Sequence, residues 1–420
     1  MAYLDTGGGI CYNIRIEGKG RYRDMKSLKE LYRIGRGPSS SHTIGPENAC
    51  KIFLRENPTA DNFTVVLYES LALTGEGHGT ENVIRSVLPN VNVVCDVETK
   101  TAHPNTMDLI AYRGGAEISR MRVYSIGGGA IRIEGRVDAE GKQVYPLRSL
   151  TEIRRYCEEK NMRLCDYVYE CEGEEIKAFL LEVWETMQRS ITAGIGATGI
   201  LPGGLHVERR ANILYSRHAP EESAETRENR LVCAYAFAVG EENASGGTIV
   251  TAPTCGACGV VPAVLMYARR RQGYTDEEIV DALATAGLIG NLIKTNASIS
   301  GAECGCQAEI GSACCMATAA LSQLRKMSLR QIEYGAEIAM EHHLGLTCDP
   351  VCGLVQIPCI ERNAVASMRA INASSLAYFL SDSRKISFDL VIETMYETGR
   401  DLHRSYRETA EGGLAKLYKK

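Results

Sequence analysis

The hydrophobic pattern of this chain changes near residue 150, and this change constrains the fold more than any other feature. Before it, apolar residues form short runs rich in β-branched and aromatic side chains, which are typical of strands. These runs are 63–68, 91–98, 107–113 and 120–126. After it, apolar residues recur at helical spacing, as in Ile176, Leu180, Val183, Met187 and Ile191. The sequence therefore predicts a multidomain chain, with an N-terminal α+β domain followed by a mostly all-α C-terminal domain.

Helix-start signals support this division. Ser149, Thr275 and Ser328 are each followed three residues later by Glu or Gln, the pattern of a capping box. The predicted helices are 47–56 in the first half and, in the second, 228–239, 259–271, 276–293, 310–326, 328–343, 361–380 and 388–408. The expected parts are an extension at 1–24, an α+β domain at 25–155, a linker at 156–175 and a helical domain at 176–420.

Composition argues against several classes of protein. The formal net charge of -5 gives no electrostatic case for binding nucleic acid. No apolar run reaches the roughly 18 residues that a membrane span requires, and the first residues lack the pattern of a secretory signal. We therefore expect a cytoplasmic protein with reduced thiols. The three glycines at 127–129 run on into a strand-like segment, so no phosphate-binding loop is expected there.

The cysteines are concentrated in the helical half. Of the 16 cysteines, nine lie close together in the sequence: Cys255, Cys258, Cys304, Cys306, Cys314, Cys315, Cys348, Cys352 and Cys359. Most of these occupy three breaks between helices that are rich in Gly, Pro and Ser, at 251–259, 296–311 and 347–359. Loops on a rigid scaffold are where binding and catalytic groups concentrate, so the three loops could converge on one point.

Four roles are open for these cysteines. Cys255-x-x-Cys258 has the spacing of a zinc knuckle, but no second pair follows at the expected interval. A redox pair is weaker, because this motif does not open a helix in a βαβ unit. Burial in the core explains Cys314 and Cys315, which lie in a predicted helix. An iron–sulfur cluster needs thiolates from Gly- and Pro-rich loops, and the C-D-P and I-P-C sequences within 347–359 fit that description.

Longer motifs give the chain a resemblance to a known family. These motifs are GPSSSHTIGP (37–46), SLALTGEGHGT (70–80), LPGGL (201–205), GCQAEIG (305–311) and EHHLGLTCDPVCGLVQIPCIERN (341–363). In this order they resemble the iron–sulfur L-serine dehydratases, also called L-serine ammonia-lyases, with both family domains fused in one chain. The resemblance runs from about Met25 to near the C-terminus. It implies a lyase that converts L-serine to pyruvate and ammonia.

The resemblance also implies a cofactor. In that family three cysteines hold a [4Fe–4S] cluster, and carried over they are Cys306, Cys348 and Cys359. Cys304 and Cys352 are neighbours that we do not count as ligands. No cysteine follows Cys359, so one iron is expected to lack a protein thiolate, to act as a Lewis acid on the serine hydroxyl and to be sensitive to oxygen.

The reaction further needs a base for the α-proton and a site for the carboxylate. Histidines in Gly-rich loops of the first half are the candidate bases: His78 is favoured, with His42 and His103 as runners-up. The alternative for each is a structural histidine. A run dense in hydrogen-bond donors precedes the helix predicted to start at Pro46. We expect this run to bind the substrate carboxylate; its residues are Ser39, Ser40, Ser41 and Thr43. Its alternative is a simple N-cap turn.

Other functions stay open at this point. The same chemistry could act on L-threonine or L-cysteine; for threonine, one methyl group gives only about 1–3 kcal/mol of discrimination. A non-catalytic iron–sulfur sensor would use the cluster but would need no loop rich in Ser and His. Two-fold pairs are the commonest oligomers, so a homodimer is expected.

Overall fold

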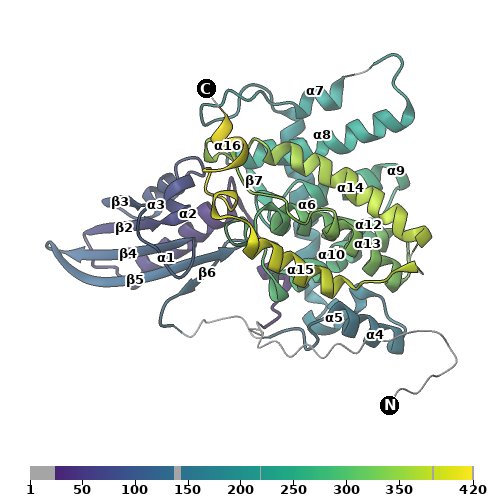
Figure 1. Ribbon diagram of the computed structural model, residues 1–420, viewed down its shortest axis with the longest axis horizontal. Coiled ribbons are helices and arrows are strands. Elements are labelled where there is room, and N and C mark those ends of the chain that lie inside the picture. Colours follow the sequence, from purple (N-terminus) through teal and green to yellow (C-terminus); the bar gives the residue numbers. More distant parts are fainter. Residues whose placement is uncertain (1–23, 137–142, 218, 381–382, 419–420) are drawn as a thin grey trace.

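The computed structural model describes residues 24–136, 143–217, 219–380 and 383–418. A sheet with its helices lies at one end, helices form the rest, and the C-terminal segment (yellow) lies at their junction (Figure 1). The predicted fold class is confirmed. Of the expected extension at 1–24, all but Asp24 lies outside the described residues.

The first half is built on a five-stranded sheet in the order β3-β2-β4-β5-β6. Its strands are β2 (Asn62–Tyr68), β3 (Val91–Asp96), β4 (Thr106–Arg113), β5 (Ala116–Gly127) and β6 (Ala130–Ile133). β2 and β3 are parallel, and the other neighbours are antiparallel. Alternate residues of β2, Phe63, Val65 and Leu67, are buried in one cluster with residues of the helices α1 (Gly45–Glu56) and α3 (Thr80–Val87). This alternation is why the short apolar runs form strands.

The second half is helical. Its helices are α4 (Leu150–Lys160), α5 (Leu164–Glu172), α6 (Glu175–Gly196), α7 (Ala211–Ser216), α8 (Ala224–Ala244), α9 (Val260–Gln272), α10 (Asp276–Asn296), α11 (Gly301–Cys304), α12 (Ser312–Leu324), α13 (Leu329–Glu341), α14 (Cys359–Leu380), α15 (Phe388–Asp401) and α16 (Gly413–Leu417). Every residue of α12 is buried, and this helix packs against α9, α10, α13 and α14. Because α12 is rich in small residues, its neighbours can approach closely and form a dense core. Thr275 and Ser328 form the predicted capping boxes, and Ser149 caps α4.

Two predicted segments differ in the structure. The helix expected at 388–408 ends at Asp401, because the following residues leave helical geometry and approach the loop at 347–359 (the cysteine loop). The linker expected at 156–175 is instead the end of α4 and the whole of α5. Its buried side chains join the helical core: Cys157, Leu164, Cys165, Tyr167 and Val168. Polar residues on the outer face of α5 conceal this buried face in the sequence.

Hydrogen bonds and close packing join the two halves. β1 (Ile34–Arg36) pairs antiparallel with β7 (Thr248–Val250), which lies more than 200 positions later in the chain. The loop that carries His78 packs on the cysteine loop so closely that a Cβ at Gly77 would lie 2.6 Å from the backbone oxygen of Gly353. The relative placement of the halves is therefore fixed by backbone contacts as well as by side chains.

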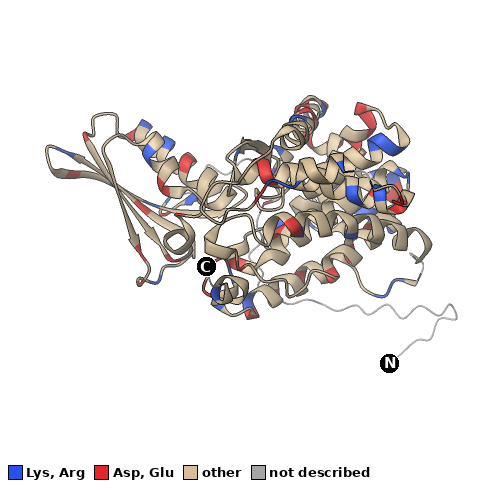
Figure 2. Cartoon of the chain, turned by 90° about the horizontal axis from the view of Figure 1, so that it is seen from above, with Lys and Arg blue, Asp and Glu red and all other residues tan. Residues whose placement is uncertain are grey.

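Lys and Arg positions (blue) alternate with Asp and Glu positions (red) along the cartoon of the chain (Figure 2). Neither sign is confined to one part of the fold, and the formal net charge is only -5. Within the described ranges, no helix is both long enough and apolar enough to cross a membrane.

Replacing Gly77 with alanine should separate the two loops. The added Cβ has no room beside Gly353, and overpacking of this kind typically costs about 1–3 kcal/mol. We expect the free energy of unfolding in urea to fall by that amount. Gly196→Ala is the matched control, since a Cβ there meets nothing within 4 Å. Equal stability of the two variants would contradict the close contact between the loops.

Candidate active site

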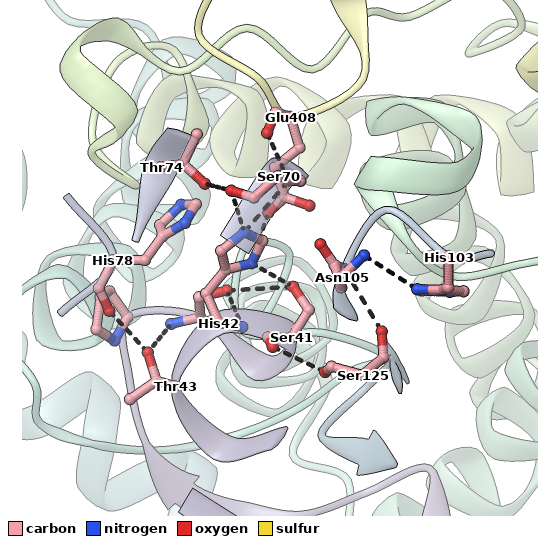
Figure 3. Close-up of polar contacts among 12 residues, drawn as sticks. Ser41, His42, Thr43, Ser70, Thr74, His78, His103, Asn105, Ser125 and Glu408 are labelled. Carbon is pink, nitrogen blue, oxygen red and sulfur yellow. Dashed lines mark hydrogen bonds and ion pairs between the residues drawn. The ribbon is translucent and has the colours of Figure 1, made fainter. Parts of the chain in front are cut away.

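Two buried histidines face each other in the first half, near its contact with the second (Figure 3). His42 lies in a π-helical turn (Ser40–Ile44) that runs into α1, and His78 lies just before α3. Their rings are in edge contact, with centroids 4.4 Å apart. The sequence placed the helix start at Pro46, whereas the helical turns begin at Ser40.

Hydrogen bonds distinguish the two histidines. His42 Nε2 lies 3.2 Å from the carbonyl oxygen of Ser70, which can only accept, so this nitrogen carries the proton. The other nitrogen, Nδ1, lies 2.8 Å from the Ser41 hydroxyl and accepts from it. Both nitrogens of His42 are therefore engaged, whereas Nδ1 of His78 is buried and has no hydrogen-bond partner among the described residues.

Burial keeps both histidines neutral. It lowers the pKa of His42 to about 4. Burial, together with the nearby His42, holds the pKa of His78 well below its usual range. A neutral imidazole can accept a proton, so Nδ1 of His78 is able to act as a general base near neutral pH.

The serine-rich run folds around these histidines. Ser39 caps the π-helical turn, because its hydroxyl accepts from the backbone N–H of His42 at 3.1 Å. The Thr43 hydroxyl donates to the carbonyl oxygen of His78 at 2.9 Å and so ties the two loops together. Ser40 and Ser41 are buried in the same turn. The run therefore does form an N-cap turn at Ser39, which leaves a binding role for its other groups as a prediction.

His103 lies apart from the histidine pair (Figure 3). Its Nε2 lies 3.2 Å from a carboxylate oxygen of Glu303, which is in the segment 296–311 that also carries Cys304 and Cys306. Its Nδ1 accepts from the backbone N–H of Asn105 at 3.1 Å. Since both ring nitrogens are engaged, His103 is placed to connect the sheet to α11.

The three candidate ligand cysteines come together in the second half. Cys306 precedes a second π-helical turn (Gln307–Gly311), Cys348 lies in the loop after α13, and Cys359 begins α14. The Cys348 thiol hydrogen-bonds to Cys306, and together with the positive charge of Arg362 this lowers the pKa of Cys306 to about 6. Arg362 also interacts with the charges of Cys359 and Cys348. This guanidinium favours the thiolate of Cys306, whereas the pKa values of Cys348 and Cys359 are held well above their usual range by their hydrogen bonding, their burial and the nearby Cys306.

The neighbouring cysteines are placed differently. Cys352 is exposed. Cys304 packs against α15, because a Cβ added at Gly399 would lie 2.5 Å from the Cβ of Cys304. Cys314 and Cys315 are buried within the helices, where their thiols donate to the carbonyl oxygens of Ala366 and Ala336. The structure thus separates these four from the group formed by Cys306, Cys348 and Cys359.

Two carboxyl groups at the site were missed by the sequence analysis. Burial and the nearby Cys306 raise the pKa of Glu309 to about 8. Burial, with Glu309 and Cys306 nearby, also holds the pKa of Glu408 well above its usual range. Glu309 lies inside the quoted GCQAEIG motif, which was a usable signal. Glu408 lay inside a predicted helix, and nothing in that pattern pointed to a site.

Glu408 reaches the site because the C-terminal segment runs between the two halves. Its N–H donates to the carbonyl oxygen of Cys348 at 2.8 Å, and its own carbonyl oxygen accepts from the Ser70 hydroxyl at 2.7 Å. One carboxylate oxygen, Oε1, lies 3.6 Å from His42 Nδ1. The side chains of Glu408, His42 and His78 each offer an atom within 4.8 Å of the others.

A cavity of about 260 Å³ opens beside this group. Ser70 and Thr409, which flank the histidines and Glu408, form part of its wall. Arg400, Arg404 and Arg407 line it as well. The cavity offers a small polar molecule an approach to the buried site.

Comparison with known proteins identifies the family. The model of the serine dehydratase beta chain matches residues 27–91, and that of the serine dehydratase alpha chain matches residues 89–415. The border between them falls before β3, inside the sheet. The chain therefore belongs to the serine dehydratase family and is an enzyme of the lyase class, with both family chains joined in one polypeptide.

Individual relatives agree over nearly the whole length. The chain is 41% identical to an L-serine dehydratase of Haemophilus influenzae, over 93% of this chain and 99% of that protein. It is also 41% identical to L-serine dehydratase 1 of Escherichia coli, over 93% of this chain and 99% of that protein. An L-serine dehydratase of Streptomyces coelicolor is 41% identical, over 93% of this chain and 98% of that protein. The expected single-chain form is confirmed.

The depressed pKa of His42 should appear as a pH dependence of stability. Below its unfolded pKa near 6.5 the unfolded chain binds a proton, whereas the folded state does not until about pH 4. Stability is therefore lost as the pH falls through this window, by about 3 kcal/mol for this group. We expect His42→Asn to lose less stability than the wild type between pH 7 and 4.5, measured by urea unfolding. His403→Gln, at an exposed site, should parallel the wild type, and a parallel curve for His42→Asn would contradict the burial argument.

Proposed function

We propose that this enzyme dehydrates and deaminates L-serine to pyruvate and ammonia, using a [4Fe–4S] cluster held by Cys306, Cys348 and Cys359. The observation that carries this proposal is the meeting of two groups of residues across the junction of the halves. The second half contributes the three thiols and Arg362. The first half contributes the neutral His42 and His78 with their hydroxyl-rich turn.

The chemistry of the cysteines fits such a cluster. Iron–sulfur clusters bind thiolates, and the three thiols interact with one another and with the guanidinium of Arg362. Without a cluster only Cys306 has a lowered pKa, while the pKa values of Cys348 and Cys359 are raised by their buried surroundings and by the nearby Cys306, so binding of iron would have to supply the charge that stabilises those two thiolates. Soft thiolate ligands also select iron–sulfur clusters over hard cations. When bound, a cluster with three cysteine ligands supplies a Lewis acid for the β-hydroxyl of serine.

His78 is the proposed base. Its Nδ1 is neutral, buried and without a partner among the described residues, so it can take the α-proton of the substrate. His42 remains the runner-up, but its two nitrogens already bond Ser41 and Ser70. We assign His42 to holding its neighbours in position, and His103 to linking the sheet with Glu303.

The run from Ser39 to Thr43 is the proposed site for the substrate carboxylate. The first N–H groups of a helix have no intrahelical partner and favour anions, and this helix begins at Ser40. Ser39 and Thr43 support the turn through their own hydrogen bonds. Loss of the α-proton and the hydroxide leaves aminoacrylate, which tautomerises and is hydrolysed by water to pyruvate and ammonia.

L-Threonine is an alternative substrate, because one methyl group gives only about 1–3 kcal/mol of discrimination, and L-cysteine, with a thiol in place of the hydroxyl, is another. A comparison of kcat/KM for the three amino acids decides among them. We further propose a cytoplasmic homodimer, for which the mass of the protein in solution is the test.

Serine substitution at the ligand positions tests the cluster. In protein purified without oxygen, Cys306→Ser, Cys348→Ser and Cys359→Ser should each lose the visible absorption, the bound iron and pyruvate formation from L-serine, because a hydroxyl is a poor ligand for this iron. Cys352→Ser and Cys315→Ser are the controls and should keep all three. A colourless wild type that is fully active would refute the cluster. A wild type with a cluster and no turnover would favour an iron–sulfur sensor.

Replacing the proposed base should affect turnover alone. General-base catalysis contributes about 100- to 10,000-fold to the rate, so we expect kcat of His78→Asn to fall by that factor while its iron content stays at the wild-type level. His103→Asn should change kcat by less than tenfold. If His42→Asn lost its activity and His78→Asn kept it, the assignment of the base would pass to His42.

A further inference from the structure

Glu408 lies in the candidate site, but the proposed reaction assigns no role to its side chain. Its backbone is held at both ends, by Cys348 and by Ser70. Its φ of 57° lies in the left-handed region, which is uncommon for a residue with a side chain. Its second carboxylate oxygen, Oε2, is buried and has no hydrogen-bond partner among the described residues. The fold therefore directs a carboxyl group into the site and leaves half of it unpaired.

Among the described residues, none of the groups that shift the pKa of Glu408 is a cation, although Arg400, Arg404 and Arg407 line the cavity nearby. Cys306 and Glu309 add negative charge nearby, and the two histidines are neutral. Arg362 bonds the carbonyl oxygen of Thr347 and lies 3.6 Å from Asp349, so its guanidinium serves the cysteine loop. The carboxyl group accepts a hydrogen bond from the backbone N–H of Ala302, but a buried oxygen without a partner, such as Oε2, is unfavourable. A cationic donor beside Oε2 would remove this cost.

The proposed substrate carries one such donor. L-Serine has a hydroxyl, a carboxylate and an ammonium group on adjacent carbons. With the hydroxyl toward the cysteines and the carboxylate at the turn from Ser39 to Ser41, the ammonium is the group still without a partner. Glu408 lies between these two regions, through Cys348 on one side and His42 on the other.

We propose that Glu408 binds the ammonium group of the α-amino acid substrate and so turns its α-proton toward His78. This inference rests on the proposed function. An ammonium group has three donors, and its positive charge favours the ionised form of the Glu408 carboxyl group. The resulting charge-assisted hydrogen bonds are the strong ones. The substrate class is thereby narrowed to amino acids with a free α-ammonium, since a hydroxy acid without it would leave Glu408 unpaired.

A divalent metal ion is the competing occupant. The donor atoms of His42, His78 and Glu408 are close enough to hold one. However, Nδ1 of His42 already accepts from Ser41, and a metal on His78 would remove the proposed base. An ammonium group needs only Glu408 and leaves both imidazoles as they are.

Two inhibitors separate the ammonium from the rest of the substrate. L-Alanine has the ammonium and carboxylate without the hydroxyl, and 3-hydroxypropionate has the hydroxyl and carboxylate without the ammonium. In Glu408→Gln, a lost charge-assisted bond should raise the inhibition constant of L-alanine and the KM for L-serine by about 10- to 100-fold. The inhibition constant of 3-hydroxypropionate should stay within about twofold, and so should the iron content.

Glu411→Gln is the matched control, because it removes an exposed carboxylate from the same segment and should change none of these values. Glu408→Asp keeps the charge but shortens the side chain. It should show the same selective effect on L-alanine at a smaller size, and it decides the matter if the glutamine variant does not fold.

Equal weakening of both inhibitors would overturn the assignment, and so would loss of iron from Glu408→Gln, which would indicate a structural role. One extra divalent ion per wild-type chain, absent from Glu408→Gln, would overturn it in favour of a metal site. Failure of the proposed function would give a different result from failure of the Glu408 assignment. In that case the wild type would form no pyruvate from L-serine, whatever the ratio of the two inhibition constants.

Discussion

The backbone hydrogen bonds of Glu408 are the interaction on which the site depends. One joins it to Cys348 at 2.8 Å, and the other accepts from Ser70 at 2.7 Å. Ser70 in turn contacts Nε2 of His42 through its carbonyl oxygen. A single residue of the C-terminal segment therefore connects the cysteine loop with the histidine pair, and a shift of that segment would change the distance between them.

Burial determines the electrostatics of this junction. Removed from water, the two imidazoles are uncharged and Glu309 ionises only with difficulty. Arg362 is the cation that serves the thiols. A site of this kind favours a zwitterionic ligand, because the ligand brings both the positive charge for one carboxyl group and the negative charge for a helix start. Water would screen the same charges and weaken this selectivity.

Local patterns in the sequence predicted the elements well, and the motifs pointed to residues that lie close together in the structure. Alternation and helical spacing identified β2 and α10, and the motif loops brought Cys306 together with Cys348, and His42 together with His78. The apolar spacing of 388–408 did not reveal the helix end at Asp401, since the signal for that end is a hydrogen bond to a loop far away in the sequence. Glu408 was missed for the same reason, and no local pattern separates the engaged nitrogens of His42 from the unpaired Nδ1 of His78.

The division of the site between the two halves has a consequence for how it forms. The proposed catalytic groups lie where the halves meet: His78 follows Gly77, which packs against Gly353, and Glu408 accepts a hydrogen bond from Ser70. The depressed pKa values of the histidines come from their burial, so a chain whose halves were not docked would carry histidines that protonate near their ordinary pKa. The proposed base would then exist in its active form only in the docked protein. Because both halves belong to one polypeptide, the effective concentration of each half for the other is high, and this favours the one arrangement in which thiols, histidines and carboxyl groups meet.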